Sequence, residues 1–111
     1  MSADRDLLEV LAGFMNEDRD TLVPARLSIL VYLYFTGSAQ FSKLKDKLEL
    51  TSGNLASHLK KLEEMNLIKT TRGFIDVKPV RFIEITPDGV AKVREQILRM
   101  RELVSKVVEK G

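Results

Sequence analysis

The chain has 111 residues, 44% hydrophobic and 31% charged, which suits one domain with its own core and argues against disorder. It has no cysteine and one histidine, which excludes disulfides, thiolate metal sites and cysteine nucleophiles. The net charge is +2, but residues 41–81 hold nine basic and five acidic side chains. A basic middle third predicts an anionic partner, nucleic acid first, with a merely solvated basic surface as the alternative.

The sequence offers neither a membrane segment nor a secretion signal. The densest apolar run, residues 27–35, is about half of the ~18 residues that a bilayer requires, and the first six residues are acidic. We therefore expect a cytoplasmic protein, at the nucleoid if the partner is DNA. Nothing resembles a nucleophile with its base, a phosphate-binding glycine loop or a carboxylate pair, so we expect no enzyme, no cofactor and no metal site.

The first half of the chain predicts helices. Apolar residues at helical spacing indicate a helix over 4–15, and polar residues 16–20 indicate a loop. A second, mostly apolar helix begins near Pro24 and ends before Gly37. After a short segment at 39–41, which an extended conformation would suit, Ser42 is predicted to cap a helix over 43–48.

Residues 49 onward predict the rest of the architecture. Glu49 and Leu50 form a tight turn, Thr51 caps a helix over 52–65, and Asn66 ends that helix in a left-handed conformation. Two short helices around such a turn form a helix-turn-helix. Residues 67–72 and 80–85 are predicted strands joined by a loop of about seven residues. Thr86 then caps a last helix that runs to about residue 109.

The predicted fold class is therefore mainly α with a small β-hairpin (α+β). We expect a single domain over residues 1–111, made of an N-terminal helix and loop at 1–20, a core at 21–86 and a C-terminal dimerisation helix at 87–111.

The helix over 52–65 has the faces of a DNA-reading helix. Leu55, Leu59 and Leu62 share one apolar stripe, and small, polar and basic residues lie opposite. Side chains without bulk near the N-terminus let a helix approach base edges in the major groove, where the Asn54 amide suits adenine. An ordinary solvated face is the alternative. His58 lies at the edge of the stripe, which suits either a half-buried histidine or a DNA contact.

The predicted hairpin is basic with an apolar tip. Arg72 precedes the tip and Lys78 and Arg81 follow it, as in ribbons that lie on the DNA backbone or in the minor groove. The apolar residues 74, 75 and 77 either fold back on the core or pack on a partner subunit.

The last helix carries a heptad seam. Its apolar residues are spaced by three and four: Val90, Val93, Ile97, Met100, Val104 and Val107. Such a seam predicts a two-fold dimer that presents two helix-turn-helix units to a pseudo-palindromic site. Packing of the seam on the chain's own first helix is the alternative.

Several of these segments resemble a family of small winged-helix transcriptional regulators related to the MarR and ArsR regulators. The resemblance spans about residues 22–106 and includes Val-Pro-Ala-Arg-Leu-Ser-Ile-Leu at 23–30, Phe-Ser-Lys-Leu at 41–44 and Ile-Thr-Pro-Asp-Gly at 85–89. Its most specific part is Gly-Asn-Leu-Ala-Ser-His-Leu-Lys-Lys-Leu-Glu at 53–63. The resemblance implies a dimeric DNA-binding winged helix with 52–65 as recognition helix and 67–86 as wing.

This chain departs from the family at two points. Residues 74–81 lack the usual Gly-Arg-Pro-Arg type of basic wing tip and include an acid, Asp76. The cysteine and histidine clusters of ArsR-type metal sites are missing, so metal sensing is not carried over. Because the wing tip departs from the family pattern, the resemblance supports DNA contact by the recognition helix more strongly than DNA contact by the wing.

The sequence thus predicts a sequence-specific regulator that binds double-stranded DNA as a homodimer, with a protein-interaction module as the alternative. The residues expected at the DNA are Ser42, Lys43, Thr51, Ser52, Gly53, Asn54, Ser57, His58, Lys60, Lys61, Arg72, Lys78 and Arg81. Those expected at the dimer interface are Leu7, Leu11, Val90, Val93, Ile97, Met100, Val104 and Val107. Whether a small-molecule effector exists is open; Phe14, Met15, Tyr32, Tyr34 and Met100 would suit its pocket as well as they suit the core.

Overall fold

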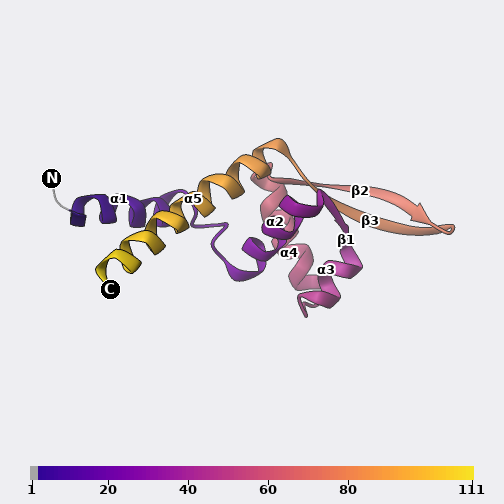
Figure 1. Ribbon diagram of the computed structural model, residues 1–111. Helices are drawn as coiled ribbons and strands as arrows, with labels where there is room; N and C mark the ends of the chain where they lie inside the picture. The colour runs from indigo at the N-terminus through magenta and orange to yellow at the C-terminus, as the bar shows by residue number, and fades with distance from the viewer. Residues whose placement is uncertain (1–2) are drawn as a thin grey trace.

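A computed structural model describes residues 3–111, with side chains from residue 6 onward. The elements are α1 (Ala3–Asn16), α2 (Pro24–Thr36), β1 (Ser38–Gln40), α3 (Phe41–Lys47), α4 (Ser52–Glu64), β2 (Ile68–Ile75), β3 (Lys78–Ile85) and α5 (Pro87–Lys110). The molecule is elongated, 62 × 24 × 23 Å, with the β2–β3 hairpin at one end and the start of α1 beside the end of α5 at the other (Figure 1). None of the described helices is long and apolar enough to cross a membrane.

One hydrophobic core joins the helices to the sheet. The second helix supplies its centre, because Ile29, Leu30 and Leu33 are at most 1% exposed. Leucines of α3 and α4 pack around it together with residues of the strands, of α5 and of the turn before β2: Leu44, Leu55, Leu59, Leu62, Leu67, Ile68, Ile83 and Val93. The prediction that α2 is the core of the domain is therefore confirmed. We call residues 21–86 the lobe.

A three-stranded antiparallel sheet of order β1-β3-β2 closes the lobe. The segment at 39–41, expected to be short and extended, largely forms β1, where Ala39 lies opposite Ile83. Strand β1 ends at Gln40, opposite Phe82, so the first half of β3 has no neighbour on that side. The hairpin therefore projects from the sheet as a wing (Figure 1).

The predicted seven-residue loop between the strands is wrong. The strands pair from Ile68–Ile85 to Ile75–Lys78, so that only two residues, Asp76 and Val77, form the turn. Both have positive φ, 48° and 61°, as a tight two-residue hairpin turn requires. The valine hid this turn, because β-branched residues rarely adopt positive φ. Proline at 79 is tolerated because its nitrogen faces the free edge of β3, where no ladder bond is needed.

Local signals placed most helix ends correctly. Thr51 Oγ1 accepts a hydrogen bond from the Asn54 backbone N–H at 3.0 Å, and Thr86 does the same for Gly89, so both predicted caps are confirmed. Asn66 has the expected left-handed φ of 60°. The predicted Ser42 cap is wrong, because α3 already begins at Phe41 and no side chain caps it.

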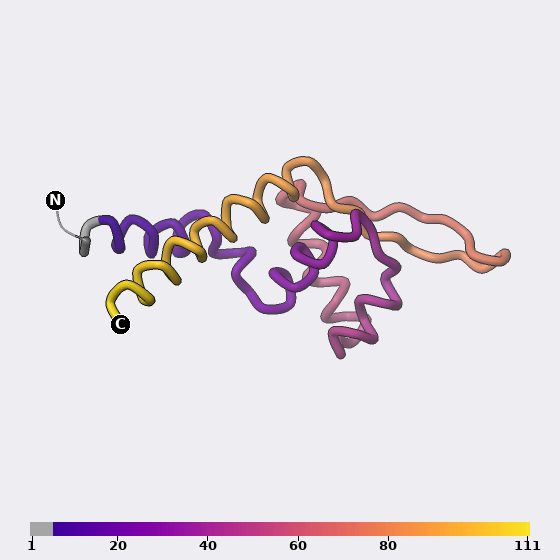
Figure 2. The backbone as a smooth tube through the Cα atoms, in the orientation of Figure 1, coloured from indigo at the N-terminus to yellow at the C-terminus, as the bar shows by residue number. Residues whose placement is uncertain are grey.

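Helix α1 and the C-terminal half of α5 lie side by side and extend away from the lobe, which Figure 2 shows; we call this pair the arm. A buried charge cluster joins the arm to the lobe. The Asp18 carboxylate, 0% exposed, accepts hydrogen bonds from Arg99 at 2.7 and 2.9 Å and from Lys92 at 2.9 Å. The neighbouring buried residues Thr21 and Gln96 are hydrogen-bonded to each other. This cluster fixes where α5 leaves the lobe.

Candidate nucleic-acid interface

The outer face of α4 is polar, small and open. Leu55, Leu59 and Leu62 are 0–4% exposed, so the predicted apolar stripe is confirmed. Four residues of the first two turns are exposed on the other side: Ser52, Gly53, Asn54 and Ser57. A Cβ added at Gly53 would meet no atom within 4 Å. A helix end without bulk is the shape that enters a major groove.

The hydroxyl of Thr51 is already used inside the protein, because it caps the helix. This hydrogen bond uses the backbone N–H of Asn54 and caps the start of α4, while the side chain of Asn54 is exposed to solvent. Thr51 therefore helps to orient the helix, whereas the amide of Asn54 is available to a ligand.

The two lysines of α4 differ in their surroundings. Lys60 is exposed, whereas Lys61 Nζ lies 3.8 Å from the Asp20 carboxylate, in the loop between α1 and α2. An exposed ion pair of this length is weak, so Lys61 remains able to change partners.

His58 lies against α2 rather than on the open face. Its Nδ1 accepts a hydrogen bond of 3.2 Å from Arg26 Nε, which places the imidazole proton on Nε2 when the ring is neutral. Burial lowers the pKa of His58, and the positive charge of Arg26 lowers it further. Arg26 also donates to the Asp20 backbone carbonyl at 2.7 Å. His58 therefore helps to join α4 to α2, and we leave it out of the proposed DNA surface.

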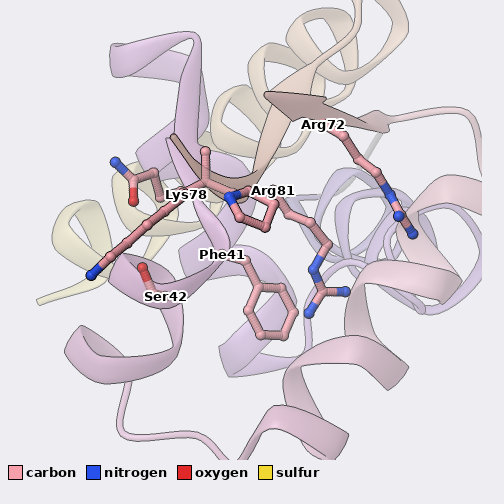
Figure 3. A pocket seen from close by; sticks show the side chains of 8 residues that line it. Phe41, Ser42, Arg72, Lys78 and Arg81 are labelled. Carbon is pink, nitrogen blue, oxygen red and sulfur yellow. The ribbon is translucent and has the colours of Figure 1, made fainter. Parts of the chain in front are cut away.

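Helix α3 carries the next two predicted residues, Ser42 and Lys43, both exposed. Lys43 Nζ lies 5.6 Å from the centre of the Tyr32 ring, so its side chain leans toward α2. Ser42 lies at the other side of α3, beside the wing (Figure 3).

The wing brings Arg72, Lys78 and Arg81 to one cleft, with Ser42 opposite (Figure 3). Sequence reasoning missed Phe41, whose ring centre lies 3.8 Å from the guanidinium carbon of Arg81. Only the tertiary structure reveals this contact, because nothing in the local sequence links β3 with the start of α3.

The wing tip does not fold back on the core. Phe74, Ile75 and Val77 are 75%, 41% and 92% exposed. The first of the two alternatives for these residues is therefore wrong.

The five residues considered for an effector pocket do not come together. Tyr34 lines an apolar hollow of about 370 Å³ between α2 and α5, and Tyr32 lines a separate hollow of about 570 Å³ between α2 and α3. Neither hollow includes Phe14, Met15 or Met100. Within the part of the chain that the structure describes, no three potential metal ligands are clustered.

The predicted interface residues of the arm divide into two groups. Ile97, Val104 and Val107 are 42–65% exposed, whereas Val93 is 5% exposed and packs from α5 into the core of the lobe. Helix α1 packs on α5 within one chain, so the chain's own first helix covers part of α5.

The chain matches the family of winged helix DNA-binding domains over residues 25–104, and it belongs to that family. An uncharacterized protein of Methanocaldococcus jannaschii is 39% identical over 84 residues, covering 76% of this chain and 90% of that protein. The structure of a transcriptional regulator homologue from Pyrococcus horikoshii has a TM-score of 0.83 at 30% identity, covering 89% of this chain and 97% of the other.

YusO from Bacillus subtilis is similar in fold, with a TM-score of 0.74 at 21% identity over 100% of this chain and 86% of the other. The winged-helix fold that the sequence predicted is thus confirmed. The family is one of DNA-binding domains and not of enzymes, in agreement with the sequence.

Proposed function

We propose that the protein is a transcriptional regulator that reads a specific sequence in double-stranded DNA as a homodimer. The observation that carries the proposal is the open end of α4, where Ser52, Gly53, Asn54 and Ser57 are exposed. With α4 in a major groove, Asn54 and Ser57 face base edges and Lys60 faces phosphates. The site of action is then the nucleoid, in the cytoplasm.

The experiment that tests base reading compares the affinity of the protein for an operator, selected from a pool of sequences, with its affinity for random duplex. A randomised duplex pool is first selected for binding, and affinities are measured at a fixed salt concentration. Asn54→Ala lowers discrimination at one base pair by about 1–3 kcal/mol. Lys60→Gln is the matched control, because removal of a phosphate-binding charge weakens operator and random duplex by the same factor. Equal losses on both duplexes for Asn54→Ala would contradict its role as base reader.

The homodimer rests on the apolar surface of the arm. Leu8, Met15, Val104 and Val107 are 58–71% exposed in the single chain. Large apolar side chains that gather on a surface mark interaction sites. A second copy that covers them gives a two-fold dimer, whose half-sites lie about 10–10.5 base pairs apart or multiples of that. The wing lies at the far end of the molecule from the arm (Figure 1), which leaves both α4 helices free to face DNA.

Light scattering tests this assembly. Val104→Glu places a charge in the proposed interface and yields monomers. Val77→Glu makes the same change at a residue 92% exposed on the wing tip. It leaves the dimer intact if the arm forms the interface, and it yields monomers if the wing tip packs on the partner subunit instead. A wild-type monomer at micromolar concentration would contradict the proposal.

The exposed apolar wing tip favours a second candidate, a module that binds an acidic protein through its basic face. Capture of a protein partner with no retention on bulk genomic DNA would support this candidate over the regulator.

A further inference from the structure

The hollow of about 570 Å³ between α2 and α3 is lined by residues of these two helices alone. We call it the α2–α3 hollow. From α2 it is lined by Leu27, Val31 and Phe35, which follow one another at intervals of four residues and so share one face of the helix. Leu44 and Leu48 line it from α3. Its volume and its mainly apolar lining are typical of a binding site.

Two aromatic side chains of α2 are uncovered at the α2–α3 hollow. Phe35 is 79% exposed and Tyr32 is 36% exposed, although α2 supplies the centre of the core. Large apolar side chains that gather on a surface mark interaction sites, and buried aromatic residues dominate the binding energy of protein interfaces. Phe35 is therefore placed to act as the anchor of an interface.

The charge at the α2–α3 hollow is positive. Lys43 and Lys47 line it from α3, and none of the lining residues is acidic. Among the described residues, no carboxylate forms an ion pair with either lysine. Lys43 Nζ lies 5.6 Å from the centre of the Tyr32 ring, and this cation–π contact holds the charge at the hollow. An occupant that complements this surface combines an apolar body with negative charge.

The apolar and the basic residues both repeat with the period of a helix. At 1.5 Å per residue, the stripe from Leu27 to Phe35 extends about 12 Å along α2, and Lys43 and Lys47 are about 6 Å apart along α3. The single carboxylate of a small amphiphile would pair with only one of these lysines. A helix with apolar residues at each turn, and acidic residues four apart beside them, matches both repeats.

We propose that the α2–α3 hollow binds an acidic amphipathic helix of another protein. The apolar face of that helix covers Phe35 and the stripe beside it, and its acidic residues pair with Lys43 and Lys47. Lys43 is thereby assigned to protein binding and not to DNA. Because no described residue of α4 or of the wing lines the hollow, the inference goes beyond the proposed function and does not depend on it.

The test uses a displayed library of helical peptides of about 16 residues, whose surface positions vary among apolar, acidic and basic residues. The library is selected on the immobilised protein without DNA, so that failure of the DNA-binding proposal leaves the result standing. The selected peptides are expected to carry apolar residues one turn apart with acidic residues beside them, and to shift the NMR signals of α2 and α3. Selection of no peptide, or of peptides that shift signals elsewhere, overturns the proposal.

Single substitutions then locate the contact. Phe35→Ala weakens the binding of a selected acidic peptide about tenfold or more, and Lys47→Gln weakens it about two- to fivefold. The matched controls are Phe74→Ala and Lys78→Gln, at exposed residues of the wing, and they leave the affinity unchanged. Circular dichroism verifies that each variant is folded. Equal losses in the wing variants and in the variants of the hollow overturn the proposal.

A charge reversal tests the pairing directly. The double variant Lys43→Glu with Lys47→Glu is expected to prefer a version of the peptide in which lysines replace the acidic residues, whereas the wild-type protein prefers the acidic version. A structural defect alone would weaken both versions. If the double variant keeps the preference of the wild-type protein, the charge pairing is wrong and the proposal is overturned.

Two other occupants of the α2–α3 hollow would give different results. If Phe35→Ala converts a dimer into monomers in light scattering, the hollow is covered by a second copy of this chain. If sodium octanoate shifts the same NMR signals and saturates at a lower concentration than the selected peptide, the hollow binds a small amphiphile. Either result overturns the assignment to a helix of another protein.

Discussion

The buried Asp18 carboxylate is expected to contribute far more stability than Glu17 beside it. Both accept hydrogen bonds from the Arg99 guanidinium, at 2.7 and 2.9 Å and at 2.8 Å. The Asp18 side chain is 0% exposed and that of Glu17 is 58% exposed. Loss of one partner from a buried ion pair leaves an uncompensated charge, which costs about 3–5 kcal/mol. Asp18→Asn belongs at the low end, about 3 kcal/mol, because Arg99 and Lys92 are 13–14% exposed and keep some contact with water.

The assay is thermal and urea unfolding followed by circular dichroism. A cost of about 3 kcal/mol lowers Tm by roughly 12 °C for a domain of this size. Protein concentration is kept equal for all variants, because dimer dissociation would otherwise change Tm. Glu17→Gln is the matched control and changes Tm little, since solvent screens an exposed pair. If the two variants unfold at the same temperature, burial does not decide the strength of these contacts and the reasoning is wrong.

Two further predictions concern stability. Gly89→Ala destabilises the protein by about 1–3 kcal/mol, because the new Cβ would lie 2.2 Å from the backbone carbonyl oxygen of Leu67. Gly53 also lies near the start of a helix, but a Cβ there would meet open space, so Gly53→Ala stabilises the protein by up to about 1 kcal/mol. Equal urea midpoints for both alanine variants would refute this contrast. Because the pKa of His58 is lowered in the folded protein, the unfolded state binds the proton first as the pH falls. The contribution of neutral His58 to the free energy of unfolding is therefore fully present above pH 6.5. It decreases as the pH drops from 6.5 toward the lower pKa of the folded state. Urea midpoints between pH 7.5 and 5.5 measure this loss, and an equally steep loss in His58→Gln would assign it to other groups.

Features that depend on residues close together in the chain could be predicted. The stripe of Leu55, Leu59 and Leu62 follows from helical period alone, and the three residues are indeed buried. The Thr51 and Thr86 caps involve a bond across three residues, so residue type and position were sufficient. The open polar face of α4 follows from the same period, and with it the helix on which the DNA-binding proposal rests.

Features that join distant segments were decided only by the tertiary structure. The contact of Asp18 with Arg99 spans 81 residues and that of Arg26 with His58 spans 32, and no local propensity encodes either. The two-residue wing turn was missed because strand pairing on both sides of it outweighs the reluctance of valine to adopt positive φ. Sequence therefore determined the helix-turn-helix and its outward face. Packing alone determined the length of the wing, the stacking of Arg81 on Phe41 and the direction of the arm, because each depends on which surfaces the folded core brings together.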